Sequence, residues 1–152
     1  METIKKMFTH LQWANERILE QLNKSEGFNQ QVIRLFSHIL FAEQVWFTRI
    51  QGADSSHLPI WSDAELSDCE KLVKQNEKSA ASILSQLSSS RLDETIVYQN
   101  SQGKTFNQSI REILIHVALH GQYHRGQINT WLRGNDLEPA SVDFILYARS
   151  PR

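Results

Sequence analysis

The chain has 152 residues and a formal net charge of −1, with 40% hydrophobic and 22% charged residues. Its length suits a single domain over 1–152, and its composition is typical of a globular protein. No stretch approaches the roughly 20 apolar residues of a membrane span, and scattered Lys and Arg argue against nucleic-acid binding. A lone cysteine, Cys69, excludes an internal disulfide. We therefore expect a cytoplasmic protein with no membrane or nucleic-acid partner.

The first half of the chain predicts two long helices. Apolar residues recur at helical intervals over about 2–23 and again over about 29–51. The second segment is rich enough in apolar residues that we expect it to be largely buried. Gly52 ends this segment, and 53–62, which contains a proline and Trp61, is expected to form a loop.

The second half predicts two more long helices separated by a different kind of segment. Asp63 is expected to cap a third helix, which continues to about residue 87 on the outside of the fold. Residues 95–106 place β-branched and aromatic side chains around a glycine, which predicts a short hairpin or an ordered loop. A fourth helix is expected over about 107–133, followed by one or two helical turns within 139–147. The fold class is therefore all-α, a four-helix bundle.

The fourth predicted helix carries half of the six histidines, His116, His120 and His124, spaced by four. At about 100° per residue, His120 and His124 point towards the apolar face, while His116 lies at its edge. Two histidines at i and i+4 can bind one metal ion, as in the HExxH motif. A metal would also satisfy imidazole nitrogens that are otherwise costly to bury.

Two ligands hold a metal weakly, and His38, in the apolar second helix, is the candidate third ligand. Three neutral imidazoles with an open position can bind water and lower its pKa, a pattern that favours catalysis. The plainer interpretation is that these histidines are hydrogen-bonded core or surface residues. His116 can replace His120 or His124, support them with a hydrogen bond, or lie at the surface; its angle favours the supporting role.

Residues near these histidines have two interpretations each. Glu43 is a candidate hydrogen-bond acceptor or general base near His38, although its i+5 spacing points it to another face and favours a structural carboxylate. Arg125 and Gln127 are candidates for orienting the ligand pair or meeting a substrate carboxylate, with helix-surface contacts as the plainer interpretation. Cys69 has no activating histidine beside it in sequence, so a nucleophilic cysteine is not expected.

Four segments spread along the chain carry a family resemblance. They read LQWANERIL at 11–19, SHILFAEQVW at 37–46, REILIHVALHGQYHRGQI at 111–128 and PASVDFILYAR at 139–149. In content and order they resemble the DinB-like proteins, a family that includes the YfiT-like metal-dependent hydrolases. The HxxxHRGQ motif after a histidine-bearing second helix is the most specific part of this resemblance.

The resemblance implies a four-helix bundle with up-down-down-up connectivity, often a homodimer, that holds zinc or nickel on three histidines. By position, the family ligands match His38, His120 and His124. Characterised relatives include transferases and isomerases in which the metal activates a low-molecular-weight thiol. We therefore expect a metal-dependent thiol S-transferase or hydrolase acting on a small-molecule substrate. The alternatives are a non-catalytic bundle that is stabilised by a metal or binds a small molecule, and a metal-free bundle with hydrogen-bonded histidines.

Overall fold

The computed structural model describes residues 1–25 and 30–149, and this part of the chain is mostly helical, as predicted. Within these residues, five α-helices are accompanied by one 3-10 turn and one antiparallel pair of strands. They are α1 (Glu2–Lys24), α2 (Gln30–Ile50), α3 (Leu66–Ser85), a 3-10 turn (Arg91–Asp93), β1 (Thr95–Gln99), β2 (Thr105–Ser109), α4 (Ile110–Gly134) and α5 (Phe144–Arg149). The predicted start of the second helix, at residue 29, lies outside the described residues.

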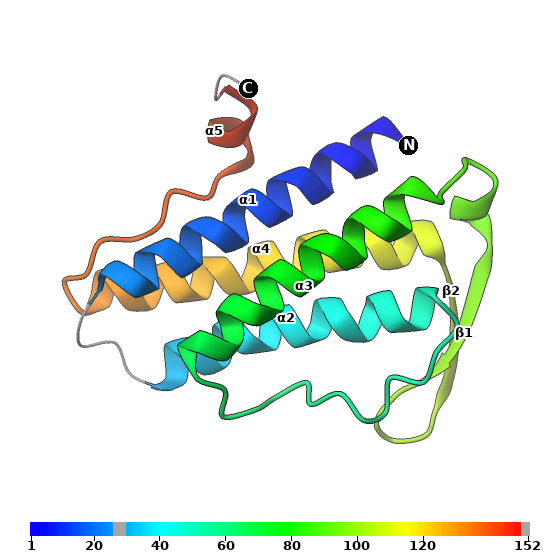
Figure 1. Ribbon diagram of the computed structural model, residues 1–152, viewed down its shortest axis with the longest axis horizontal. Helices are drawn as coiled ribbons and strands as arrows, with labels where there is room; N and C mark the ends of the chain where they lie inside the picture. Colours follow the sequence, from blue (N-terminus) through cyan, green and yellow to red (C-terminus); the bar gives the residue numbers. More distant parts are fainter. Residues whose placement is uncertain (26–29, 150–152) are drawn as a thin grey trace.

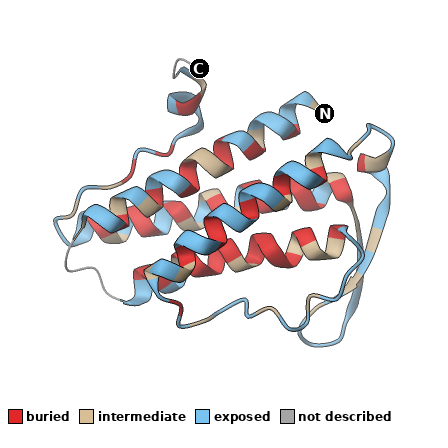
Figure 2. Ribbon diagram, in the orientation of Figure 1, coloured by how far each residue is buried: buried red, intermediate tan, exposed pale blue. Residues whose placement is uncertain are grey.

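The four long helices lie side by side, with α1 and α4 running in one direction and α2 and α3 in the other (Figure 1). Both α1 and α2 pack against α3 and α4. Apolar side chains fill the space between them, and the buried residues face inward on all four helices (Figure 2). Ile18, Phe36 and Leu132 pack in one half of this core, and Phe8 and Ile113 pack in the other half.

The third helix begins at Leu66, so the prediction that Asp63 caps it was wrong. Its N-cap is Glu65, whose backbone N–H donates to the Asp68 carboxylate at 3.2 Å, while the Glu65 side chain accepts from the Asp68 backbone. This reciprocal capping box satisfies two otherwise free backbone donors. An N-cap at Asp63 would have Leu66 three residues later, which cannot return a hydrogen bond, so it would satisfy fewer backbone donors. The helix therefore starts two residues later than predicted.

The fourth helix begins at Ile110, three residues later than predicted, because the preceding hairpin is longer than expected. Asn107 belongs to β2 and pairs with Val97 of β1. The strand ends at Ser109, whose hydroxyl accepts from the Glu112 backbone at 3.2 Å while the Glu112 carboxylate accepts from the Ser109 backbone at 2.9 Å. The predicted hairpin is confirmed, and this capping box fixes where the strand gives way to the helix.

Two of the connecting segments lie against the long helices. The chain from the end of α2 returns along the outside of that helix to reach the start of α3 (Figure 1), so 51–65 covers part of α2. The segment after α4 is fastened by Asn129, whose side-chain amide donates to the Ala140 carbonyl at 2.8 Å and accepts from the Ala140 N–H at 2.9 Å. Among the described helices, none is long and apolar enough to span a membrane.

Candidate metal centre

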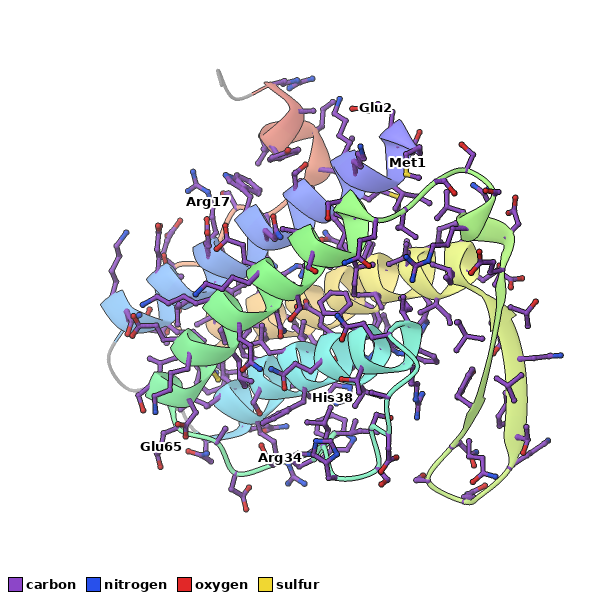
Figure 3. All side chains as sticks on the ribbon, turned by 45° about the vertical axis from the view of Figure 1, so that its right-hand side comes forward. Met1, Glu2, Arg17, Arg34, His38 and Glu65 are labelled. Carbon is purple, nitrogen blue, oxygen red and sulfur yellow. The ribbon has the colours of Figure 1, made fainter. Side chains whose placement is uncertain are left out.

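Three histidines from two helices meet where α2 packs against α4. His38 comes from α2, and His120 and His124 come from successive turns of α4. One ring nitrogen from each lies within 4.8 Å of those of the other two, and the Nε2 atoms of His38 and His120 are 3.1 Å apart. Figure 3 shows His38 below α2, on the side that faces the returning loop. We call His38, His120 and His124 the histidine trio.

The loop that follows α2 fixes the orientation of His38. The Nδ1 atom of His38 lies 2.9 Å from the Ile60 carbonyl oxygen, and the Trp61 ring stacks on the imidazole at 3.7 Å with an interplanar angle of 3°. A carbonyl only accepts hydrogen bonds, so Nδ1 carries the proton, and the neutral ring keeps a lone pair on Nε2. The loop therefore sets both the plane and the tautomer of this imidazole.

Gln127 fixes the tautomer of His124. The Gln127 Oε1 atom lies 2.6 Å from His124 Nδ1, so the imidazole donates from Nδ1 and keeps a lone pair on Nε2. An acceptor on the far nitrogen is the usual arrangement around a metal-binding histidine, because it orients the ring and raises its basicity. Of the two histidines that Gln127 was suggested to orient, the contact reaches His124. The Ile60 carbonyl was not predicted, because a backbone carbonyl group is present at every residue and carries no sequence signal.

The surroundings favour the neutral form of two of the three imidazoles. Burial lowers the pKa of His38, and it lowers the pKa of His120 to about 4, with further lowering by the charges of neighbouring histidines and of Arg125. At neutral pH both rings therefore present lone pairs instead of positive charge. Neutral imidazole is the form that binds a metal ion.

The spacing of His38 and His120 suits two ligands of one divalent metal ion, and a ring nitrogen of His124 lies within 4.8 Å of theirs. Nitrogen ligands lie about 2.0–2.1 Å from zinc, and two of them at an angle near 100° would be separated by about 3.1 Å, the separation observed between His38 and His120. Three imidazoles suit zinc and nickel better than magnesium or calcium, which prefer oxygen ligands. Without an ion, the 3.1 Å contact satisfies these nitrogens only if His120 donates to His38.

His116 lies next to the trio without belonging to it. Its side chain is exposed, and its ring centre is 5.5 Å from that of His120 and 5.4 Å from that of Trp46. The sequence places His116 at the edge of the apolar stripe, and the structure agrees with that position. His116 thus connects the trio to an aromatic side chain of α2.

Arg125 is not on the helix surface, so the plainer interpretation of this residue was wrong. It is 0% exposed, and its Nη1 donates to the Asn15 side-chain oxygen at 2.8 Å. The guanidinium folds back over Gly121 of its own helix, where a Cβ atom would come within 2.8 Å of Nη1. The missing side chain at Gly121 makes the space that lets a long charged side chain enter the core. Such a buried group is unsuited to meeting a substrate.

Glu43 is also a core residue and is only 2% exposed. Its carboxylate accepts hydrogen bonds from the side-chain amides of Asn15 and Asn76, both at 2.9 Å. Burial raises the pKa of Glu43 to about 7, opposed by these hydrogen bonds and by the charge of Arg125. Asn15, Glu43, Asn76 and Arg125 thus form what we call the core polar network. The structural interpretation of Glu43 fits this environment, and the role of general base beside His38 does not.

A groove of about 1280 Å³ lies next to the loop that contacts His38, and the three histidines themselves are not part of its wall. It lies between the last turns of α2, the following loop and strand β1, and the loop residues Ile60 and Trp61 form part of its wall. These are the same two residues that contact His38. A small molecule in this groove would therefore lie against the two residues that orient His38.

Comparison with known proteins places this chain in a family. The sequence model of the DinB family matches residues 1–152. The chain belongs to the DinB family. It is similar to protein DinB of Bacillus subtilis strain 168, with 27% identity over 93% of this chain and 91% of that protein. It is also similar to the uncharacterized protein YizA of the same strain, with 25% identity over 88% of this chain and 83% of YizA.

Membership of the DinB family and the histidine trio together fit a metal-binding protein. Within this DinB-family chain, the residues that orient the trio come from two sources. Gln127 lies one helical turn beyond His124 on the same helix, whereas Ile60 and Trp61 reach His38 from a loop 22 and 23 positions further along the chain.

Proposed function

We propose that this DinB-family protein is a metal-dependent enzyme in which His38, His120 and His124 hold a zinc or nickel ion. The observation that carries the proposal is the hydrogen bonding of two of the imidazoles. His38 and His124 each place Nδ1 against an acceptor, which leaves their Nε2 lone pairs available to one ion. In this proposal the metal site is carried by an up-down-down-up four-helix bundle, the fold that the family resemblance implies.

The residues of this chain would prepare the site before any ligand arrives. The Ile60 carbonyl and Gln127 hold two imidazoles in one tautomer, and the Trp61 ring restricts rotation of His38. The adjoining groove offers space for a small molecule. A divalent ion held by the trio would lower the pKa of a low-molecular-weight thiol or of water, which suits thiol transfer or hydrolysis at neutral pH.

The test is the metal content of tag-free protein, measured by plasma mass spectrometry after incubation with zinc and nickel. We expect close to one ion per chain in the parent and less than about a tenth of that in His124→Ala, because two remaining imidazoles bind weakly. His57→Ala is the matched control, since His57 is exposed in the loop after α2. A parent protein that stays metal-free, or a His124→Ala variant that keeps its ion, contradicts the proposal.

The choice between thiol transfer and hydrolysis has its own measurement. In cobalt-substituted protein, an added low-molecular-weight thiol is expected to change the visible spectrum if thiols bind at the trio. An unchanged spectrum would count against the transferase and leave hydrolysis as the activity to assay.

A further inference from the structure

Arg49 lies in the wall of the groove, and its guanidinium packs against two aromatic rings that also contact each other. Its guanidinium carbon is 4.7 Å from the centre of the Trp46 ring and 4.6 Å from the centre of the Tyr98 ring. Trp46 belongs to α2 and Tyr98 to β1, and their own rings meet edge to face at 5.0 Å. The position of the guanidinium is therefore fixed by packing from two elements, as a preformed binding site requires.

Among the residues that the structure describes, no carboxylate forms an ion pair with Arg49. Its Nε donates to the Ser55 hydroxyl and its Nη2 to the Gln99 carbonyl, both at 3.1 Å, and both acceptors are neutral. Within residues 1–25 and 30–149, the ion pairs join other residues, and Nη1 of Arg49 makes no hydrogen bond. Burial lowers the pKa of Arg49, the effect of partial removal from water on a cation. A partly desolvated guanidinium with a free donor is suited to an anion.

Two paths of contacts connect Arg49 to the histidine trio. On one side, Trp46 lies against Arg49 and is 5.4 Å from His116, which in turn is 5.5 Å from His120. On the other side, Ile60 and Trp61 line the same groove as Arg49 and contact His38. A molecule that reaches Arg49 with one end can therefore extend along the groove towards the trio.

The rest of the groove indicates what kind of anion it accepts. Apolar side chains contribute much of the wall, including Val97, which is 69% exposed, and Trp61, which is 50% exposed. Asp54 also lines the groove, and its negative charge opposes a doubly charged group such as phosphate. One guanidinium matches the single charge and planar shape of a carboxylate.

We propose that Arg49 binds the carboxylate of a small molecule whose apolar body lies in the groove and whose other end faces the histidine trio. The predicted contact with Arg49 follows from the groove and does not depend on a bound metal. That the other end of the molecule reacts at the histidine trio rests on the proposed function.

The test uses a matched pair of probes, 3-phenylpropionate and its neutral amide, titrated into the full-length protein and followed by NMR of ¹⁵N-labelled samples. We expect the carboxylate to bind at least about tenfold more tightly than the amide, the usual difference for a hydrogen bond to a charged group. The chemical-shift changes caused by the carboxylate should be largest at the Arg49 side-chain N–H and at the backbone amides of β1. Equal binding of the two probes, no binding of the carboxylate, or shifts centred elsewhere would overturn the proposal.

Arg49→Gln is expected to weaken 3-phenylpropionate binding about tenfold or more while leaving the amide unaffected. The matched control is Arg17→Gln, because Arg17 also lies over a tryptophan, Trp13 at 4.9 Å, but on α1. An effect in both variants, or in neither, would overturn the proposal. The titrations of the parent protein decide the question by themselves if Arg49→Gln does not fold.

Both probes are titrated with zinc-loaded protein and again after chelation, so that the two proposals can fail separately. Binding that depends on Arg49 in both states supports the inference, even if the trio holds no metal. Carboxylate binding that needs zinc and ignores Arg49→Gln would mean that the carboxylate ligates the ion. That result would overturn the inference and leave the metal centre standing.

Discussion

The histidine trio and the core polar network are built on the same two helices, yet their environments are opposite. His38 and Glu43 are five residues apart on α2, and His124 and Arg125 are adjacent on α4. In the network, Glu43 and Arg125 are at most 2% exposed and are joined through the side chain of Asn15. In the trio, His38 contacts Ile60 and Trp61, which line a groove, and ring nitrogens of the three histidines lie within 4.8 Å of one another.

The comparison distinguishes polar groups that stabilise the fold from polar groups that are arranged to bind a ligand. In the network, the Glu43 carboxylate accepts from two amides and Arg125 donates to Asn15. These contacts offset much of the cost of burying these groups, although Asn76 Oδ1 and Arg125 Nε have no hydrogen-bond partner among the described residues. In the trio, the acceptors supplied by Ile60 and Gln127 take up the far nitrogens of His38 and His124, and the near nitrogen of His38 has the near nitrogen of His120 as its neighbour at 3.1 Å. Loss of a network residue should therefore reduce stability, whereas loss of a trio residue should reduce metal binding.

The largest effect is expected from Arg125→Met at pH 8. This change leaves the carboxylate of Glu43 buried without the cation that favours its charged form, and an uncompensated buried charge costs about 3–5 kcal/mol of unfolding free energy. Urea denaturation measures the loss. Arg133→Met is the control on the same helix, because Arg133 is exposed, and it should change the stability by at most about 0.5 kcal/mol. A loss below about 1 kcal/mol for Arg125→Met would contradict the role assigned to the network.

The second prediction concerns the pH dependence that Glu43 confers. Its pKa is raised in the folded protein, to about 7 from 4.5, so the folded state holds a proton that the unfolded state has released. The resulting stabilisation is present below pH 4.5 and is lost as the pH rises through 7. Relative to Glu43→Gln, the parent should lose up to about 3 kcal/mol across this window. The exposed Glu20 gives the control, Glu20→Gln, which should follow the parent curve; parallel curves for Glu43→Gln would refute the prediction.

A smaller effect, on metal affinity, is expected from Gln127→Ala. Without the Gln127 oxygen, His124 loses the acceptor that fixes its tautomer, and such losses weaken metal binding about 10- to 100-fold. Competition with a chromophoric chelator measures the affinity. Gln127→Glu keeps an acceptor at this position and should retain the parent affinity or exceed it. Unchanged affinity in Gln127→Ala would show that the contact does not serve the metal site.

The smallest expected effect is a difference in stability between alanine substitutions at two glycines of α4. Gly126 has open space around its Cα, so Gly126→Ala should stabilise the protein by up to about 1 kcal/mol through helix propensity. At Gly121, the added Cβ meets the Arg125 guanidinium at 2.8 Å, and the gain should be cancelled or reversed. Thermal unfolding of both variants gives the comparison. Equal stabilisation by the two substitutions would mean that Arg125 moves aside at no cost.

Local sequence determined a large part of this protein. Helical periodicity depends only on neighbours three and four positions apart, so the four long helices and the pairing of His120 with His124 on one face follow from the chain itself. The hairpin was also predictable from β-branched and aromatic residues around Gly103, which adopts φ 75° in the turn. Where alternative helix starts compete over two or three residues, as before α3 and α4, the reciprocal capping boxes decided the boundary.

Only the tertiary structure decided which polar residues lie inside and what surrounds the histidines. Arg125 meets Asn15 across 110 positions of sequence, and its burial is possible because Gly121 leaves room and Glu43 supplies the opposite charge. The Ile60 carbonyl reaches His38 only because the loop after α2 folds back along that helix. Such contacts depend on the positions of several elements at once, so no local pattern of residues could specify them.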